Sequence, residues 1–177
     1  KDFRKEVVTF FDKGGSGLNI TVPHKTCAYE MAIEHSQEAL LSGTCNTLMP
    51  IKTGLYGHNT DGLGLLDDFE RLGWIINDAR ILILGAGGAV AGCLGPLLTK
   101  KPEEIVIANR SVAKAKALVE RFTSRVSVIG LDTVNAQGAP FDLVINGISA
   151  GLSGSSGVRL SDRILNANGA CYDLIYS

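Results

Sequence analysis

The spacing of hydrophobic residues along the chain becomes regular near residue 79. From there on, short apolar runs alternate with segments in which apolar residues recur at helical spacing. This alternation predicts an α/β fold, in which a doubly wound parallel sheet carries helices on both faces. The expected strands span 80–84, 104–108, 126–129, 141–145 and 170–175, and the expected helices span 89–98 and 112–122.

The part before residue 60 has a less regular pattern, which we interpret as a smaller mixed α/β unit. An amphipathic helix is expected over 3–11, followed by a short strand over 17–22. A second helix is expected to start near Pro23, because proline suits the first helical turn. A loop, a short apolar stretch over 45–49 and a turn at 54–57 complete this unit.

A third amphipathic segment connects the two parts. Its apolar residues recur at helical spacing, and Gly73 marks its end. We therefore expect two domains, residues 1–60 and 61–177, with this helix as the bridge between them. The apolar positions of the helix are Leu63, Leu65, Leu66, Phe69 and Leu72.

Composition limits the partners that the chain can bind. A hydrophobic content of 45% over 177 residues supports a buried core, and a formal net charge of −1 offers no field to attract nucleic acid or an anionic membrane. No apolar run is long enough to span a bilayer, and no signal peptide is visible. The histidines show no metal-ligand spacing. Cys27, Cys45, Cys93 and Cys171 form no C-x-x-C pair, which favours reduced thiols and a cytoplasmic location.

The stretch from Ala79 to Ala89 runs from an apolar strand into a glycine-rich turn and then into a helix of small residues. Gly85 permits the tight turn, and Gly87 lets the backbone approach a phosphate closely. The N–H groups that follow point at the anion from the positive end of the helix. Because the third glycine of the dinucleotide fingerprint would fall at Val90, the match is partial and depends on its context.

The end of the next strand predicts which dinucleotide binds. Sites that prefer NAD place an acidic residue there, whereas this chain has Asn109-Arg110-Ser111, with Lys114 one turn further on. A guanidinium is suited to a phosphate. We therefore expect Arg110 to bind a 2′-phosphate and the cofactor to be NADP, in preference to the reading of Arg110 as a solvated charge at a strand end.

Lys25 and Asp61 are the candidate proton carriers. A lysine in the first turn of a helix is unusual, because the helix dipole disfavours an ammonium there. Taken alone, Lys25 fits a surface lysine and Asp61 fits a helix N-cap. Together they could share a substrate hydroxyl, which an alcohol oxidation must deprotonate as hydride leaves the carbon.

Seven motifs follow one another over nearly the whole chain: Asn19-Ile-Thr-Val-Pro-His-Lys25, Gly43-Thr-Cys-Asn-Thr-Leu48, Asn59-Thr-Asp-Gly62, Gly85-Ala-Gly-Gly-Ala89, Asn109-Arg110, Asn146-Gly-Ile-Ser-Ala-Gly151 and Tyr172-Asp-Leu-Ile-Tyr176. In this order they resemble the motifs of the shikimate dehydrogenase family. The resemblance implies a substrate domain followed by an NADP-binding Rossmann domain, with the active site between them. It also implies the reversible NADPH-dependent reduction of 3-dehydroshikimate to shikimate, a step of aromatic amino acid biosynthesis.

The resemblance also implies a role for each matching residue. Lys25 would be the acid–base group and Asp61 its partner on the reacting hydroxyl, with further substrate contacts from Thr21, Asn46 and Tyr176. The expected cofactor-binding residues are Gly85, Ala86, Gly87, Gly88 and Ala89 for the pyrophosphate, Asn109, Arg110, Ser111 and Lys114 for the adenosine end, and Ile148, Ser149 and Leu174 for the nicotinamide side.

Two alternatives stay open at this point. A paralogue acting on quinate or another cyclic polyol acid, with NAD, would share most of these motifs, and a dinucleotide-binding module without catalysis would share the glycine turn. The resemblance further implies that an N-terminal strand and C-terminal helices of the longer protein lie outside these residues, so that residues 1–60 are a partial substrate domain. A monomer and a homodimer are both compatible with the sequence.

Overall fold

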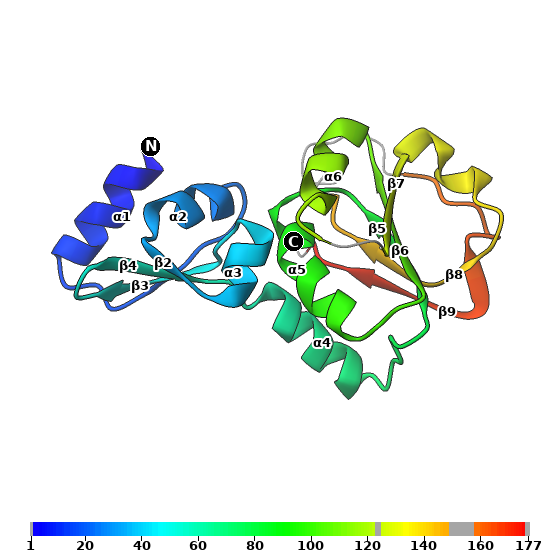
Figure 1. Ribbon diagram of the computed structural model, residues 1–177, viewed down its shortest axis with the longest axis horizontal. Helices are drawn as coiled ribbons and strands as arrows, with labels where there is room; N and C mark the ends of the chain where they lie inside the picture. The colour runs from blue at the N-terminus through cyan, green and yellow to red at the C-terminus, as the bar shows by residue number, and fades with distance from the viewer. Residues whose placement is uncertain (1, 123–124, 149–157, 176–177) are drawn as a thin grey trace.

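The computed structural model describes residues 2–122, 125–148 and 158–175, which contain two β-sheets of different kinds (Figure 1). One sheet has four short strands and the other has five parallel strands. In Figure 1 the four-stranded sheet and its helices lie on the left and the parallel sheet lies on the right. Within the described residues, no helix has both the length and the apolar character needed to cross a bilayer.

The first unit packs three helices around the four-stranded sheet. Their shared core contains Val7 from the first helix, Ala28 from the second, Ala39 from the third and Leu48 from a strand. In order, the elements are α1 (Phe3–Asp12), β1 (Leu18–Asn19), α2 (Lys25–Met31), β2 (Glu34–His35), α3 (Gln37–Ser42), β3 (Thr47–Ile51) and β4 (Gly54–His58), and the sheet order is β1-β3-β4-β2.

Several expectations for the first unit were wrong in detail. The second helix begins at Lys25, with His24 as its N-cap, so Pro23 precedes the helix and does not form its first turn. The region interpreted as a loop contains α3, and the expected turn at 54–57 is the strand β4. Strand β4 pairs with β3 along its whole length.

The second unit is the expected parallel sheet. Its strand order is β7-β6-β5-β8-β9. The chain adds β6 and β7 on one side of β5 and then β8 and β9 on the other, which is the doubly wound arrangement of Rossmann-type folds. The elements are α4 (Asp61–Arg71), β5 (Arg80–Leu84), α5 (Gly88–Thr99), β6 (Glu104–Asn109), α6 (Val112–Val119), β7 (Val126–Gly130), the 3₁₀ helix η1 (Leu131–Ala136), β8 (Phe141–Asn146) and β9 (Leu165–Asp173).

Both faces of the parallel sheet are covered, as the continuous apolar strands predict. Along β5, Ile81 and Ile83 face a core that includes residues of α4, α5 and α6, whereas Leu82 and Leu84 face a second core that includes η1. The covering of the second face was only partly foreseen, because η1 was not predicted. Strand β9 also begins earlier than expected, at Leu165.

Helix α4 lies close to α5 because Gly62 has no side chain. A Cβ at Gly62 would lie 2.6 Å from the Gly92 carbonyl oxygen and 3.0 Å from the Cys93 Cα, both backbone atoms of α5. Only glycine at position 62 allows this approach. At its other end, α4 buries Phe69 against Trp74 and Tyr172. The first residue of α4 is therefore fixed relative to the parallel sheet.

Phe69→Ala tests this anchoring of α4. Phe69 is 1% exposed, so its truncation should lower the free energy of unfolding by about 3–5 kcal/mol. Leu63 lies on the same helix but is 43% exposed, and Leu63→Ala should cost less than about 1 kcal/mol. Urea denaturation of both variants measures the difference, and equal losses would show that Phe69 does not anchor the helix.

Candidate active site

A cavity of about 470 Å³ lies where the first unit meets the parallel sheet. The first unit contributes the segment around Thr21, together with Lys25 and Asn46. The other side is formed by the start of α4, by α5 and by the residues after β9. The lining residues are Asn19, Ile20, Thr21, Val22, Lys25, Asn46, Asp61, Ala89, Cys93, Leu174 and Ile175.

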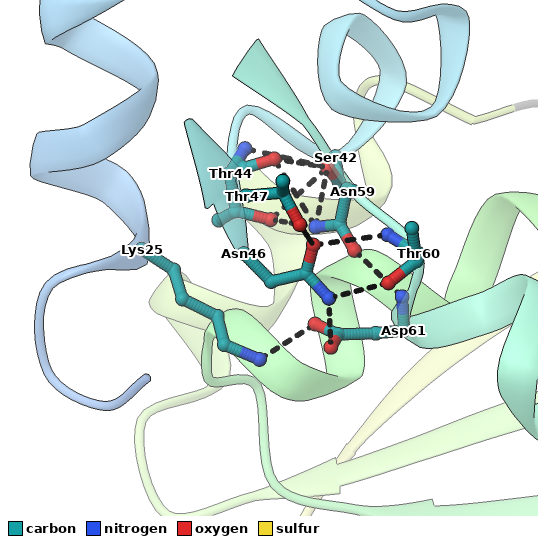
Figure 2. Close-up of polar contacts among 8 residues, drawn as sticks. All are labelled: Lys25, Ser42, Thr44, Asn46, Thr47, Asn59, Thr60 and Asp61. Carbon is teal, nitrogen blue, oxygen red and sulfur yellow. Dashed lines mark hydrogen bonds and ion pairs between the residues drawn. The ribbon is translucent and has the colours of Figure 1, made fainter. Parts of the chain in front are cut away.

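Lys25 and Asp61, which line the cavity from opposite sides, form an ion pair. Lys25 Nζ donates to Asp61 Oδ2 at 2.7 Å, and the two side chains are 11% and 19% exposed (Figure 2). Asp61 opens α4, where the helix dipole favours an anion, and Lys25 opens α2, where the dipole disfavours a cation. The carboxylate therefore supplies the stabilisation that the lysine's own helix does not.

The amide of Asn46 fixes the orientation of the Asp61 carboxylate. Its Nδ2 donates to Asp61 Oδ1 at 2.9 Å and to Thr60 Oγ1 at 2.8 Å. Its Oδ1 accepts from the Thr47 hydroxyl and from the Thr60 N–H. All four hydrogen-bonding positions of this amide are thus filled. Asp61 consequently holds Lys25 with one carboxylate oxygen and Asn46 with the other.

A second buried amide, that of Asn59, lies above the ion pair in the view of Figure 2. Asn59 Nδ2 donates to Thr44 Oγ1 at 2.8 Å and to the Thr44 carbonyl at 3.1 Å, and its Oδ1 accepts from the Asp61 N–H at 3.0 Å. Ser42 Oγ joins the same cluster through the Thr44 hydroxyl. Buried polar groups that are satisfied in this way specify a single arrangement of the loop.

The thiol of Cys93 lies on α5 at the back of the cavity. Burial, together with the negative charge of Asp61, raises the pKa of Cys93 to about 12, although the positive charge of Lys25 opposes this rise. The thiol is therefore protonated at neutral pH. It contributes an apolar surface to the cavity.

The glycine turn after β5 is shaped for a pyrophosphate. Gly85 has a φ of 101°, and a Cβ there would lie 3.0 Å from the Gly147 carbonyl oxygen. A Cβ at Gly87 would meet nothing within 4 Å, so space is open in front of α5. Gly87 caps α5 without a side-chain hydrogen bond, which leaves the N-terminal N–H groups of the helix for an anion. These residues fit a dinucleotide.

The turn after β6 places the residues expected at the adenosine end. Asn109 Nδ2 donates to the Ser111 carbonyl, and Ser111 Oγ accepts from the Lys114 N–H as the N-cap of α6. Arg110 and Lys114 are exposed. The turn is thus built by Asn109 and Ser111, and it presents two cations beside the carboxyl end of the sheet, where ligands of such folds bind.

The remaining predicted residues divide into two groups. Ile148 packs beside Gly85 and Leu174 beside Gly147, so both flank the crevice between β5 and β8. Ser149 and Tyr176 lie outside the described residues. Across the described ranges, no three side chains of His, Cys, Asp or Glu gather in a way that could hold a metal ion.

Asn59, Thr44 and Cys93 had no predicted role, although Asn59 and Cys93 lie beside the ion pair and Thr44 binds Asn59. Cys93 follows Ala89 by four residues, and this spacing places both on the helix face that lines the cavity. Asn59 precedes the first residue of α4 by two positions, where an asparagine commonly caps a backbone N–H. These local signals could have identified both residues.

Two family profiles match the chain. One, described as shikimate / quinate 5-dehydrogenase, matches residues 70–153. The other, described as the substrate binding domain of shikimate dehydrogenase, matches residues 1–48. Both units of the structure are therefore represented by profiles from the same family.

Individual relatives and solved structures agree with the profiles. The NADP(+) shikimate dehydrogenase of Pasteurella multocida is 44% identical over 100% of this chain and 65% of its own length. An Ael1 enzyme from Pseudomonas putida has a TM-score of 0.85 at 40% identity, covering 99% of this chain and 65% of that one. A Thermus thermophilus shikimate 5-dehydrogenase solved with NADP(H) and shikimate has a TM-score of 0.80 at 28% identity, covering 98% and 63%. The chain spans a little under two thirds of the curated relatives it matches.

Thiol labelling tests the description of the cavity wall. At pH 8 a thiol with a pKa of about 12 has about one part in ten thousand as thiolate, so Cys93 should resist iodoacetamide in the native protein. Cys45, whose pKa burial raises to about 11, should also resist. Cys171 is exposed and should be labelled first. Mass spectrometry of native and urea-unfolded samples locates the labels, and early labelling of Cys93 would contradict the buried wall.

Proposed function

This chain belongs to the shikimate dehydrogenase family, and from that premise we propose that the protein it comes from reduces 3-dehydroshikimate reversibly to shikimate with NADPH. The observation that carries the proposal is the contact between Lys25 and Asp61 in a cavity that also reaches α5, directly after the glycine turn. A proton carrier and a dinucleotide crevice on one cavity are the two requirements of an alcohol dehydrogenase.

In this proposal the cavity holds the ring of the substrate between the two units. When bound, the nicotinamide supplies or accepts the hydride. The Lys25 ammonium uses one of its three donors on Asp61, and the others are directed to the ligand. In the direction of reduction, Lys25 gives a proton to the carbonyl oxygen, and in oxidation its neutral amine takes the hydroxyl proton.

Asp61 has two tasks in this mechanism. Its Oδ2 holds the lysine in place, and its carboxylate accepts a hydrogen bond from the reacting hydroxyl while Lys25 is an ammonium. When the amine is neutral, the hydroxyl turns its single hydrogen to Lys25 Nζ. Thr21 and Asn46 border the same cavity and complete the proposed contacts with the substrate. Because both donors of Asn46 are already used, a substrate oxygen that binds this amide replaces the Thr60 hydroxyl.

We also propose a separate role for each of the two parts of the chain. Residues 1–60 would bind the substrate and residues 61–177 the cofactor. NADP is favoured by two exposed cations, Arg110 directly after β6, where NAD-binding proteins have an acid, and Lys114 in the first turn of α6. The reduced cysteines agree with work in the cytoplasm.

Lys25→Ala in the complete protein tests the acid–base role. Loss of the proton carrier should lower kcat by about 10²–10⁴-fold while shikimate still binds. Lys52→Ala, at an exposed position between β3 and β4, should leave kcat unchanged. Shikimate-dependent reduction of NADP gives the rates, and calorimetry gives the affinity. Equal rates in both variants would remove Lys25 from the mechanism, and turnover of quinate with NAD in place of shikimate would favour the quinate alternative.

Arg110→Ala tests the choice of cofactor. Removal of a charged partner of the 2′-phosphate should raise the KM for NADP about tenfold, while the KM for NAD, which lacks this phosphate, stays the same. Lys116→Ala, an exposed position on α6, serves as the control. Steady-state kinetics with the two cofactors measure the effect. Parallel changes for both cofactors would contradict a role in phosphate recognition.

A further inference from the structure

We infer that Asn59 and Gly92 are positioning residues, which together set where the Asp61 carboxylate stands relative to Lys25. The inference rests on the proposed function of the Lys25–Asp61 pair. Neither residue needs to touch the substrate, because both act through Asp61. We call the two residues the Asn59–Gly92 seat.

Asn59 holds the main chain of Asp61 to the first unit. Its side chain is fully buried, at 0% exposure, and its carbonyl oxygen accepts from the Asp61 N–H. Its amide nitrogen donates to the hydroxyl and carbonyl of Thr44. The residue that would normally cap α4, Thr60, makes no side-chain cap of its own. Asn59 therefore takes the place of the N-cap and ties the start of α4 to the loop before β3.

Because Gly92 has no side chain, the side chains of Asn59 and Asp61 can pack directly against the backbone of α5. A Cβ at this position would lie 2.9 Å from both amide atoms of Asn59 and 3.0 Å from Asp61 Oδ2. Neither side chain can yield freely, because Asn59 is held by Thr44 and Asp61 is held by Lys25 and Asn46. An added methyl group must move at least one of them.

The seat also connects the carboxylate to the cofactor side of the cavity. Gly92 lies one helical turn after Gly88, which starts α5 behind the glycine turn. Helix α5, whose N-terminus would face the pyrophosphate, therefore also limits how closely the Asp61 carboxylate can pack against it. Misplacement of a reacting group by about 1 Å can cost about a hundredfold in rate, so a methyl group at this contact should be visible in kcat.

Gly92→Ala in the complete protein is the main test, with Gly95→Ala on the same helix as its matched control. A Cβ at Gly95 would meet Leu41 and Phe122 at 3.5 Å, an ordinary contact away from the ion pair. Both changes replace glycine by a better helix former. We expect Gly92→Ala to lower kcat at least about tenfold with the KM for shikimate within about twofold, and Gly95→Ala to leave both unchanged.

Asn59→Ala and a double-mutant cycle complete the experiment. If Gly92→Ala acts through the carboxylate, its effect on kcat should largely disappear in an Asp61→Ala background. Asn59→Ala should lower kcat in the same way, with calorimetric binding of shikimate to the nucleotide-free protein retained. A wild-type rate for Gly92→Ala, or an effect that adds fully to that of Asp61→Ala, overturns the inference. An inactive wild-type protein would instead overturn the proposed function, and the thermal midpoints identify any variant that has merely lost its fold.

Discussion

The close approach of α4 to α5 is the constraint on which the site depends. At Gly62 a Cβ would meet the backbone of α5, and at Gly92 a Cβ would meet the side chains of Asn59 and Asp61. This contact brings the first residue of α4 beside the face of α5 that lines the cavity. Asp61 then lies at the junction of the two units. It meets Lys25 there, although β2, α3, β3 and β4 separate the two residues in the chain. The ion pair is thus a result of backbone packing as much as of charge attraction.

The parallel sheet could be predicted from the sequence because its strands are continuous apolar runs and its helices follow at regular intervals. The first unit was harder to predict. Helix α3 has only six residues, which is too short for a clear helical periodicity. Its N-cap Ser36 and its left-handed Gly43 are helix-end signals, but they also occur in loops. Strand β4 contains Gly57, which resembles a turn residue. Its glycine is explained only by Cys45 and Ala32, which would lie within 3 Å of a Cβ there.

The candidate site shows the same division between local and tertiary information. Lys25 and Asp61 were identified by motif, and their meeting at 2.7 Å agrees with the proposed shared hydroxyl. The cap position of Asn59 has a local signal, but its contact with Thr44 could not be predicted, because the two residues are fifteen positions apart and meet only after the sheet has formed. Periodicity describes which face of an element is buried, but it does not describe which polar groups satisfy one another inside.

The hydrogen bonds around residues 59–61 have a consequence for how the protein meets its ligands. Asn46 and Asn59 precede α4 in the chain and bind Asp61 at the start of that helix. Phe69, near the other end of α4, is buried against the parallel sheet. Any swing of one unit against the other must break these amide bonds or bend around them. These hydrogen bonds therefore oppose rotation of the two units about residues 59–61, because each broken bond would leave a buried amide without its partner.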